Sequence, residues 1–150
     1  MYSKQEASLV PKNFWTSFGQ YMKPLPGAEG ATVNWLNYKT GIKHIFFRMD
    51  VDNNHASICI ELSHPDPVLR DQYYERFEEI SSILRNTMNE EWLWQKEVKD
   101  EHGQSLSSIG IDLKNVSLFN TADWPAIISF LKPRIIALDK FWTQVKDSFD

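Results

Sequence analysis

The residues best suited to chemistry lie in one short stretch, residues 44–64. Within this stretch every second residue is apolar, and these apolar residues share one face. The other face carries a base, a guanidinium and two carboxylates: His44, Arg48, Asp50 and Glu61. This period of two is typical of strands with one buried face. Asp52-Asn53-Asn54 interrupts the stretch with residues that favour a tight turn. The pattern therefore predicts a hairpin with a candidate polar binding face.

The position of the turn decides which of these residues lie opposite one another. A turn at Asp52-Asn53 places His44 opposite Glu61, whereas a turn at Asn53-Asn54 places Phe46 opposite Glu61. The two registers differ by an even step, so the same residues share a face in both. In the second register Glu61 is diagonal to His44 and Arg48, within reach of long side chains.

Three interpretations of this face are open. The first is a ladder of solvated cross-strand ion pairs. The second is a binding site for an anionic or planar ligand, because Arg48 lies beside a histidine and an aromatic ring. The third is catalysis by Glu61 and His44, although no nucleophile motif accompanies them. The chain has no metal-ligand spacing and no glycine-rich phosphate loop, so we predict no catalytic residue, metal or cofactor.

Aromatic residues are abundant, with six Trp, nine Phe and five Tyr. Trp92 and Trp94 lie on the same face of a predicted strand. Packing beneath a helix is one explanation for this pair. An exposed stacking platform is the other, which makes the two residues a candidate aromatic surface.

Composition indicates one globular domain that spans residues 1–150. The net charge of −4 disfavours strong nucleic-acid binding. Cys59 is the only cysteine, so the chain forms no internal disulfide. The N-terminus lacks a signal-peptide pattern, and no apolar run is long enough to span a membrane. We therefore expect a cytoplasmic protein without membrane contact.

The first half of the chain predicts one helix followed by three strands. Ser3 and Glu6 form a capping box, so the helix begins at Ser3, or at Ser8 if Pro11 has to lie in its first turn. Three strands joined by tight turns are antiparallel. Their predicted ranges are Val33–Thr40, Ile42–Asp50 and His55–Ser63.

The second half predicts a helix, two strands and a long final helix. Asp66 is the N-cap of the first of these helices and Pro67 its first residue. The strands are Trp92–Val98 and Ser107–Leu113. The last helix begins near Thr121–Asp123, and Pro133 is expected to kink or split it.

The apolar residues of the last helix alternate three and four apart, which suits packing on the sheet or a dimer seam. The order of elements predicts an α+β domain: an antiparallel sheet of about five strands with helices packed on one face.

Several motifs resemble a bacterial family, domain of unknown function 4268, over nearly the whole chain. They are Phe14-Trp15, Ile58-x-Ile60-Glu61-Leu62, Trp92-x-Trp94 and Asp123-Trp124-Pro125. A further match at residues 132–138 is similar to the short stand-alone branch of that family. Longer members carry this domain behind a region that looks like a restriction-endonuclease fold. The resemblance thus implies a link to nucleic-acid processing or defence for those proteins, and it assigns no catalytic residues.

The predicted order of elements also matches the restriction-endonuclease core, which has an acid on its second strand and acid-x-Lys on its third. Here Asp50 ends the second strand, and the third has Glu61-Leu62-Ser63. Ser63 stands where the lysine belongs, so water activation beside a metal lacks its usual partner. The match therefore indicates coincidence or an inactive site.

We expect a non-enzymatic interaction module that binds a protein partner or itself. One alternative is an accessory domain in nucleic-acid processing or defence that binds through Arg48 and His44. The other is a small-molecule or metal-assisted enzyme centred on Glu61, with His44 and Asp50 beside it.

Overall fold

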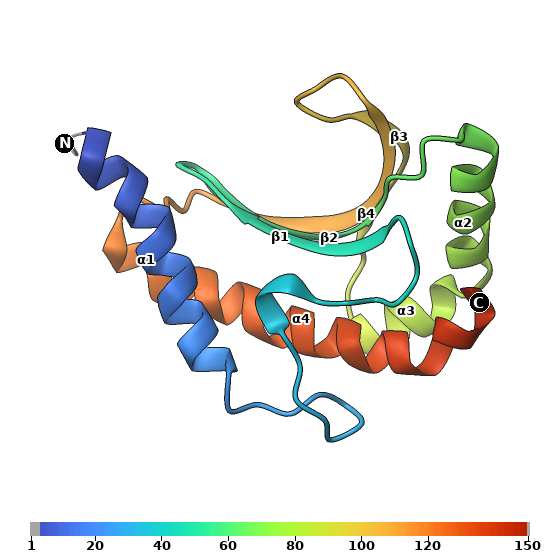
Figure 1. The fold of residues 1–150 in the computed structure, drawn as a ribbon, viewed down its shortest axis with the longest axis horizontal. Helices are drawn as coiled ribbons and strands as arrows, with labels where there is room; N and C mark the ends of the chain where they lie inside the picture. Colours follow the sequence, from blue (N-terminus) through green and yellow to red (C-terminus); the bar gives the residue numbers. More distant parts are fainter. Residues whose placement is uncertain (1–3, 150) are drawn as a thin grey trace.

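Residues 4–149, which the computed structural model describes, fold into a four-stranded antiparallel sheet and four α-helices (Figure 1). The strand order is β1-β2-β4-β3. The strands are β1 (Ile45–Val51), β2 (His55–Leu62), β3 (Leu93–Lys99) and β4 (Ser105–Lys114). The α-helices are α1 (Lys4–Met22), α2 (Pro67–Glu79), α3 (Ser81–Met88) and α4 (Trp124–Val145). Short 3-10 segments are η1 (Trp35–Asn37), η2 (Thr121–Asp123) and η3 (Lys146–Phe149). The predicted α+β class is confirmed.

The β1–β2 hairpin has the second of the two predicted registers. Arg48 pairs with Cys59 and Phe46 with Glu61, so Asn53 and Asn54 form the turn. The Asp52 carboxylate accepts hydrogen bonds from the backbone N–H groups of Asn54 and His55, each at 2.9 Å. This Asx interaction closes the turn and fixes the register of every later pair.

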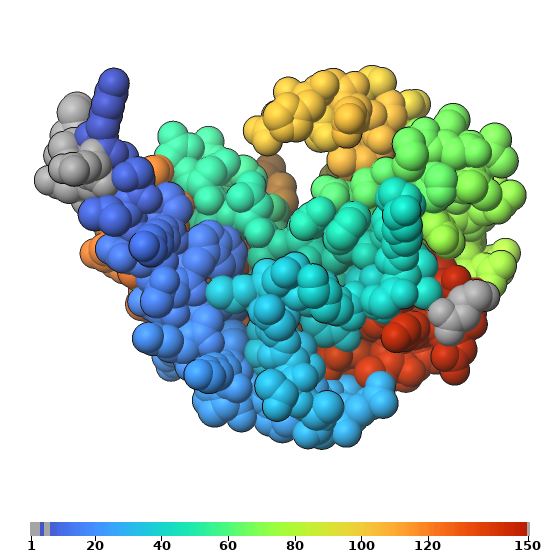
Figure 2. Space-filling model, viewed as in Figure 1, coloured from blue at the N-terminus to red at the C-terminus, as the bar shows by residue number. Residues whose placement is uncertain are grey.

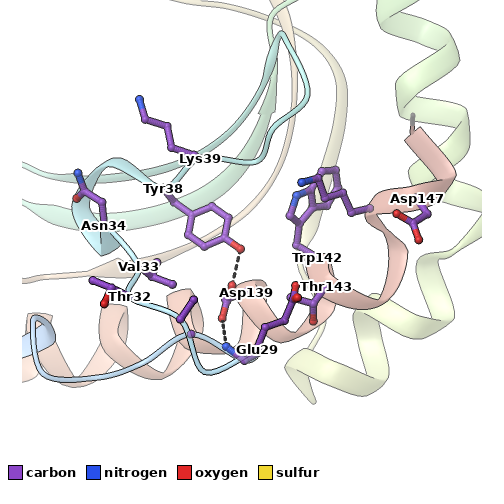
Figure 3. Close-up of a pocket in the computed structure, with 14 residues that line it drawn as sticks. Glu29, Thr32, Val33, Asn34, Tyr38, Lys39, Asp139, Trp142, Thr143 and Asp147 are labelled. Atoms are coloured by element: carbon purple, nitrogen blue, oxygen red, sulfur yellow. Dashed lines mark hydrogen bonds between the residues drawn. The ribbon is translucent and has the colours of Figure 1, made fainter.

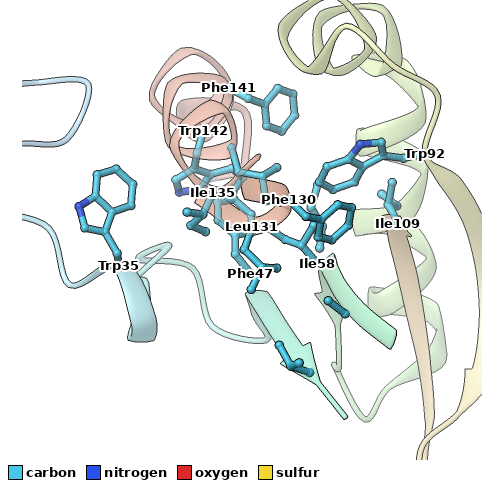
Figure 4. Close-up of a cluster of buried hydrophobic side chains, with 14 of the residues drawn as sticks. Trp35, Phe47, Ile58, Trp92, Ile109, Phe130, Leu131, Ile135, Phe141 and Trp142 are labelled. Carbon is cyan, nitrogen blue, oxygen red and sulfur yellow. The ribbon is translucent and has the colours of Figure 1, made fainter. Parts of the chain in front are cut away.

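The core lies between the sheet and α4 (Figure 4). Ile58 and Ile60 of β2 are fully buried, as are Ile135 and Leu138 of α4. Burying each such side chain contributes about 1.5–3 kcal/mol. The apolar stripe of α4 is therefore used within its own domain and does not form an exposed dimer seam.

The predicted strand at Val33–Thr40 is wrong, which reduces the sheet from the expected five strands to four. The segment instead forms η1, where the Asn34 side chain accepts a hydrogen bond from the Asn37 backbone N–H. Trp35 is only 3% exposed, and its indole N–H donates to the Leu25 carbonyl. Local capping by Asn34 and burial of Trp35 outweigh the strand propensity of the segment.

The helix starts follow the sequence signals in part. Asp66 caps α2 by accepting from the Val68 backbone N–H, with Pro67 as the first residue, as predicted. The predicted continuous helix is in fact two, because the backbone leaves helical geometry at Ile80. The alternative start of the first helix at Ser8 is wrong, since α1 is already helical at Lys4. Ser3 lies outside the described residues.

Prolines lie inside two continuous helices. Pro11 lies within α1, and Pro133 does not split α4. Ser129, the residue whose carbonyl loses its helical partner because of Pro133, is exposed. Water can therefore satisfy that carbonyl, which lowers the cost of the proline.

The face of the sheet opposite α4 is concave and carries no helix (Figure 1). The β3–β4 hairpin curls above this face and leaves a hollow between itself and β1–β2 (Figure 2). Gly110 permits the close approach of β4 to β2, because a Cβ there would lie 2.7 Å from the Cys59 Cβ. We call this concave surface the open face. Among the described residues, no helix is long and apolar enough to cross a membrane.

Candidate functional site

The open face carries the arginine and the glutamate that the sequence predicted to be neighbours. Arg48 Nε lies 3.2 Å from Glu61 Oε2, and the Arg48 guanidinium lies 4.1 Å from the centre of the Phe46 ring. The Arg48 side chain is 51% exposed, so the ion pair is well solvated and contributes little to stability. Its charge is nevertheless neutralised locally by Glu61.

Asp50 lies on the same face but far from Glu61. It pairs with Ser57, four residues along β2 from Glu61, which corresponds to about 13 Å. The two carboxylates therefore cannot share one metal ion, which removes the geometry that a restriction-endonuclease site needs. Within residues 4–149, no three His, Cys, Asp or Glu side chains gather closely enough to hold a metal.

A second carboxylate continues the row that begins at Asp50. Asp50 pairs with Ser57, and Ser57 pairs with Asp112 of β4, so the three side chains point to the open face. Asp50 and Asp112 are both exposed, and neither forms an ion pair with another described residue. These two charges are free to meet a partner.

Beside this row, the open face has a hollow of about 170 Å³ with a floor of small side chains. Its lining includes Ser57, Cys59, Ser108 and Gly110, with Leu93 at the rim. Leu93 is 64% exposed, which is unusual for a strand leucine. Burial raises the pKa of the Cys59 thiol to about 11, so the thiol stays protonated near neutral pH and is a poor nucleophile.

His44 does not join Arg48 and Glu61. It precedes β1 with a positive φ of 70°, and its ring lies 4.5 Å from the ring of His64. It forms no ion pair with Glu61. Partial burial, then the nearby His64 and Lys43, lower the pKa of His44. The acid–base pair of His44 and Glu61 that the sequence suggested is therefore not assembled.

The two tryptophans of the candidate aromatic surface belong to the packing of the domain. Trp92 is 6% exposed, and its indole N–H donates to the Glu90 carboxylate. Arg134 holds the same carboxylate with two hydrogen bonds of 2.9 and 2.8 Å. The Trp94 ring meets Tyr74 edge to face. A buried ring offers no face for stacking, so Trp92 has the packing role.

A further hollow, which was not predicted, lies between α4 and the loop of residues 27–39 (Figure 3). Its volume is about 840 Å³, and Asp139 of α4 lies at its base with 4% exposure. The Tyr38 hydroxyl donates to Asp139 Oδ1 at 2.5 Å, and the Ala28 backbone N–H donates to Oδ2 at 2.6 Å. Burial, then the hydrogen bond to Asp139, raise the pKa of Tyr38, which keeps the hydroxyl protonated.

Both oxygens of Asp139 thus accept from the protein itself. A carboxylate satisfied in this way ties the loop to α4 and is poorly placed to accept a proton from a substrate. One sequence signal could have revealed it. Asp139 lies one turn after Ile135 and one turn before Trp142, so it is a charge within the apolar stripe of α4.

Comparison with known proteins gives one match. The model of a family described as a domain of unknown function (DUF4268) matches residues 10–146, nearly the whole chain. No curated protein and no solved structure matches the chain.

Proposed function

The chain belongs to the DUF4268 family, and we propose that it is a protein-interaction domain that binds a basic segment of a partner protein on the open face. The observation that carries this proposal is the charge of an uncovered, concave sheet face. A concave face with free charges and one exposed apolar side chain offers a partner both orientation and contact area.

The free charges of the open face are mainly negative. Where β1, β2 and β4 pair, its carboxylates outnumber its lysine and arginine side chains: Asp50, Glu61 and Asp112 against Arg48 and Lys114. Glu61 neutralises Arg48, and Asp52 lies 2.8 Å from His55. On these three strands Asp50 and Asp112 remain without an ion pair to another described residue, and Lys114 is the cation beside them. This balance attracts lysine and arginine side chains and repels the phosphates of nucleic acid.

The hollow beside these carboxylates supports the same partner. A side chain of the partner would enter the hollow between two lining residues. Leu93 would give it an apolar contact, and Asp112 would give it a negative charge. An apolar contact beside a charge gives a partner side chain both packing and orientation. A lysine or arginine next to an apolar residue in the partner fits this arrangement.

The proposal is tested by nuclear magnetic resonance with a short peptide of alternating lysine and leucine. Saturable shifts are expected at the amides of Ser57, Cys59 and Gly110, which line the hollow. The double variant Asp50→Asn, Asp112→Asn should bind about fivefold more weakly, because it loses both free charges. The same peptide with glutamate in place of lysine should not bind.

The matched control removes two exposed carboxylates elsewhere, with Glu75→Gln and Asp147→Asn. It should bind the peptide as the unaltered chain does. Equal weakening in both double variants would show that only net charge matters and would overturn the proposal. The proposal would also be overturned if the open face bound duplex DNA in preference to the peptide. A dimer in sedimentation, with the open face as its interface, would likewise contradict it.

A further inference from the structure

Arg70 is a buried cation that lacks a counter-ion. It lies in the first turn of α2 and is 5% exposed. Its Nη1 donates to the backbone carbonyls of His64, at 3.2 Å, and Ser105, at 3.4 Å. No carboxylate among the described side chains pairs with it, and its Nε is buried without a hydrogen-bond partner. A buried guanidinium in this condition is costly, because no acceptor replaces the water that its Nε has lost.

A chain of contacts links Arg70, through His64 and Ser105, to further donors. On one side, Lys99 Nζ donates to Ser105 Oγ at 2.6 Å. On the other side, the ring of His64 lies against the ring of His44. The sheet explains why these residues meet, since β1 and β4 begin where β2 and β3 end. Figure 1 shows α2 standing at that end of the sheet. We call this group, Arg70 with His44, His64, Lys99 and Ser105, the basic corner.

The carboxylates near the basic corner do not neutralise it. Asp66 accepts from the Val68 backbone N–H as the N-cap of α2. Its own backbone N–H donates to His64 Nδ1 at 3.0 Å. His64 Nδ1 is therefore an acceptor, which leaves the proton of the neutral ring on Nε2 as a free donor. Asp71 follows Arg70 in α2 and pairs with no described cation.

We propose that the basic corner binds a tetrahedral oxyanion of the phosphate class. Its donors come from α2, from the two histidine segments and from the β3–β4 hairpin. These donors are more numerous than the two oxygens of a carboxylate, so a group with more oxygens fits them better. The Arg70 guanidinium favours such a dianion, because it offers charged donors in a fixed geometry. This inference is independent of peptide binding on the open face, because it uses other residues.

The test is a resonance titration with inorganic phosphate, followed by O-phosphoserine. Saturable shifts are expected at the amides of His64, Arg70 and Ser105. Arg70→Met should weaken binding by about tenfold or more, because it removes the charged donor and keeps the bulk of the side chain. The matched control is Arg76→Met on the same helix, where the arginine is exposed and bonds to the Ser148 carbonyl. It should bind phosphate as the unaltered chain does.

The two ligands distinguish the source of the oxyanion. Tighter binding of O-phosphoserine supports a phosphoryl group carried by a larger ligand, and equal binding supports free phosphate. Shifts that grow linearly with concentration, or equal affinity in the Arg70 variant, would overturn the proposal. If Arg70→Met fails to fold, the double variant His64→Gln, Lys99→Met provides the same comparison.

Discussion

Asp139 and Arg70 are both buried charges on helices, and they differ in how the protein satisfies them. Asp139 is 4% exposed and accepts one hydrogen bond at each oxygen. Arg70 is 5% exposed, bonds to two carbonyls through one nitrogen, and has a bare Nε. A satisfied buried charge fixes a structure, whereas an incompletely satisfied one costs free energy until a ligand completes it.

The comparison explains why the larger hollow is not the better ligand site. The hollow above Asp139 has about 840 Å³, yet its buried carboxylate has no oxygen left without a partner. The basic corner has donors in excess of its acceptors. A buried polar group without a hydrogen-bond partner is therefore a stronger indication of a ligand site than the volume of a hollow.

Removing the charge of Asp139 should give the largest effect on stability. Asp139→Asn leaves Tyr38 and Ala28 to share one neutral acceptor, so the free energy of unfolding should fall by about 2–4 kcal/mol. Urea unfolding measures this change. Asp147→Asn, at the exposed rim of the same hollow, should stay within about 0.5 kcal/mol of the unaltered chain. A loss below about 1 kcal/mol in Asp139→Asn would show that the tie is weak.

Tyr38→Phe should cost somewhat less, about 1.5–3 kcal/mol, because Asp139 keeps its bond from Ala28. The folded state raises the pKa of Tyr38, so the contribution of the hydroxyl is complete below the unfolded pKa near 10. It is lost as the pH rises further, by no more than about 1.4 kcal/mol per unit. The stability difference between the two chains should therefore shrink above pH ~10. A constant difference would contradict this assignment.

Arg70→Met should change stability by less than about 1 kcal/mol when no oxyanion is present. The variant loses two long hydrogen bonds to carbonyls but also removes a buried charge that has no counter-ion. Urea unfolding in a buffer free of phosphate and sulfate measures the change. If the free energy of unfolding fell as much as in Asp139→Asn, Arg70 would have a structural role like that of Asp139.

The hairpin of residues 44–64 was predictable because its signals are local. Alternation and the Asx turn depend on neighbours in sequence, so they predicted the two faces and limited the pairing to two registers, one of which is observed. The segment Val33–Thr40 misled because a side-chain cap at Asn34 and the burial of Trp35 decide its shape. Strand propensity is assigned residue by residue, so it reflects neither the cap nor the burial.

The buried charges could not be paired from the sequence. Tyr38 and Asp139 are 101 residues apart, and only the packing of the loop on α4 brings them together. Arg70 follows an N-cap and reads as an ordinary polar residue of a helix, since its burial depends on the ends of β2 and β4. His44 was assigned to the open face, but its positive φ turns it toward His64. Sequence patterns give faces, and tertiary contacts decide which charges are satisfied.

The smallest expected effect tests whether His44 takes part in the basic corner. Sulfate is the suitable ligand, because its charge is constant over the range in which phosphate itself titrates. Partial burial, His64 and Lys43 lower the pKa of His44, so the ring is neutral at pH 7.5 and protonates as the pH falls. A bound dianion favours the protonated ring, so sulfate should bind about fivefold more tightly near pH 5.5.

The other charges that face His44 and His64 set the control for this measurement. Lys43, Lys99, Arg70, Asp66 and Asp71 are unchanged in the His44 variant, so their contribution cancels when the two chains are compared. His44→Gln should therefore bind sulfate with nearly the same affinity at both pH values, while Arg70→Met should lose affinity at both. If His44→Gln keeps the full pH dependence, the proton is taken up elsewhere. The oxyanion then rests on Arg70 and its other neighbours, without His44.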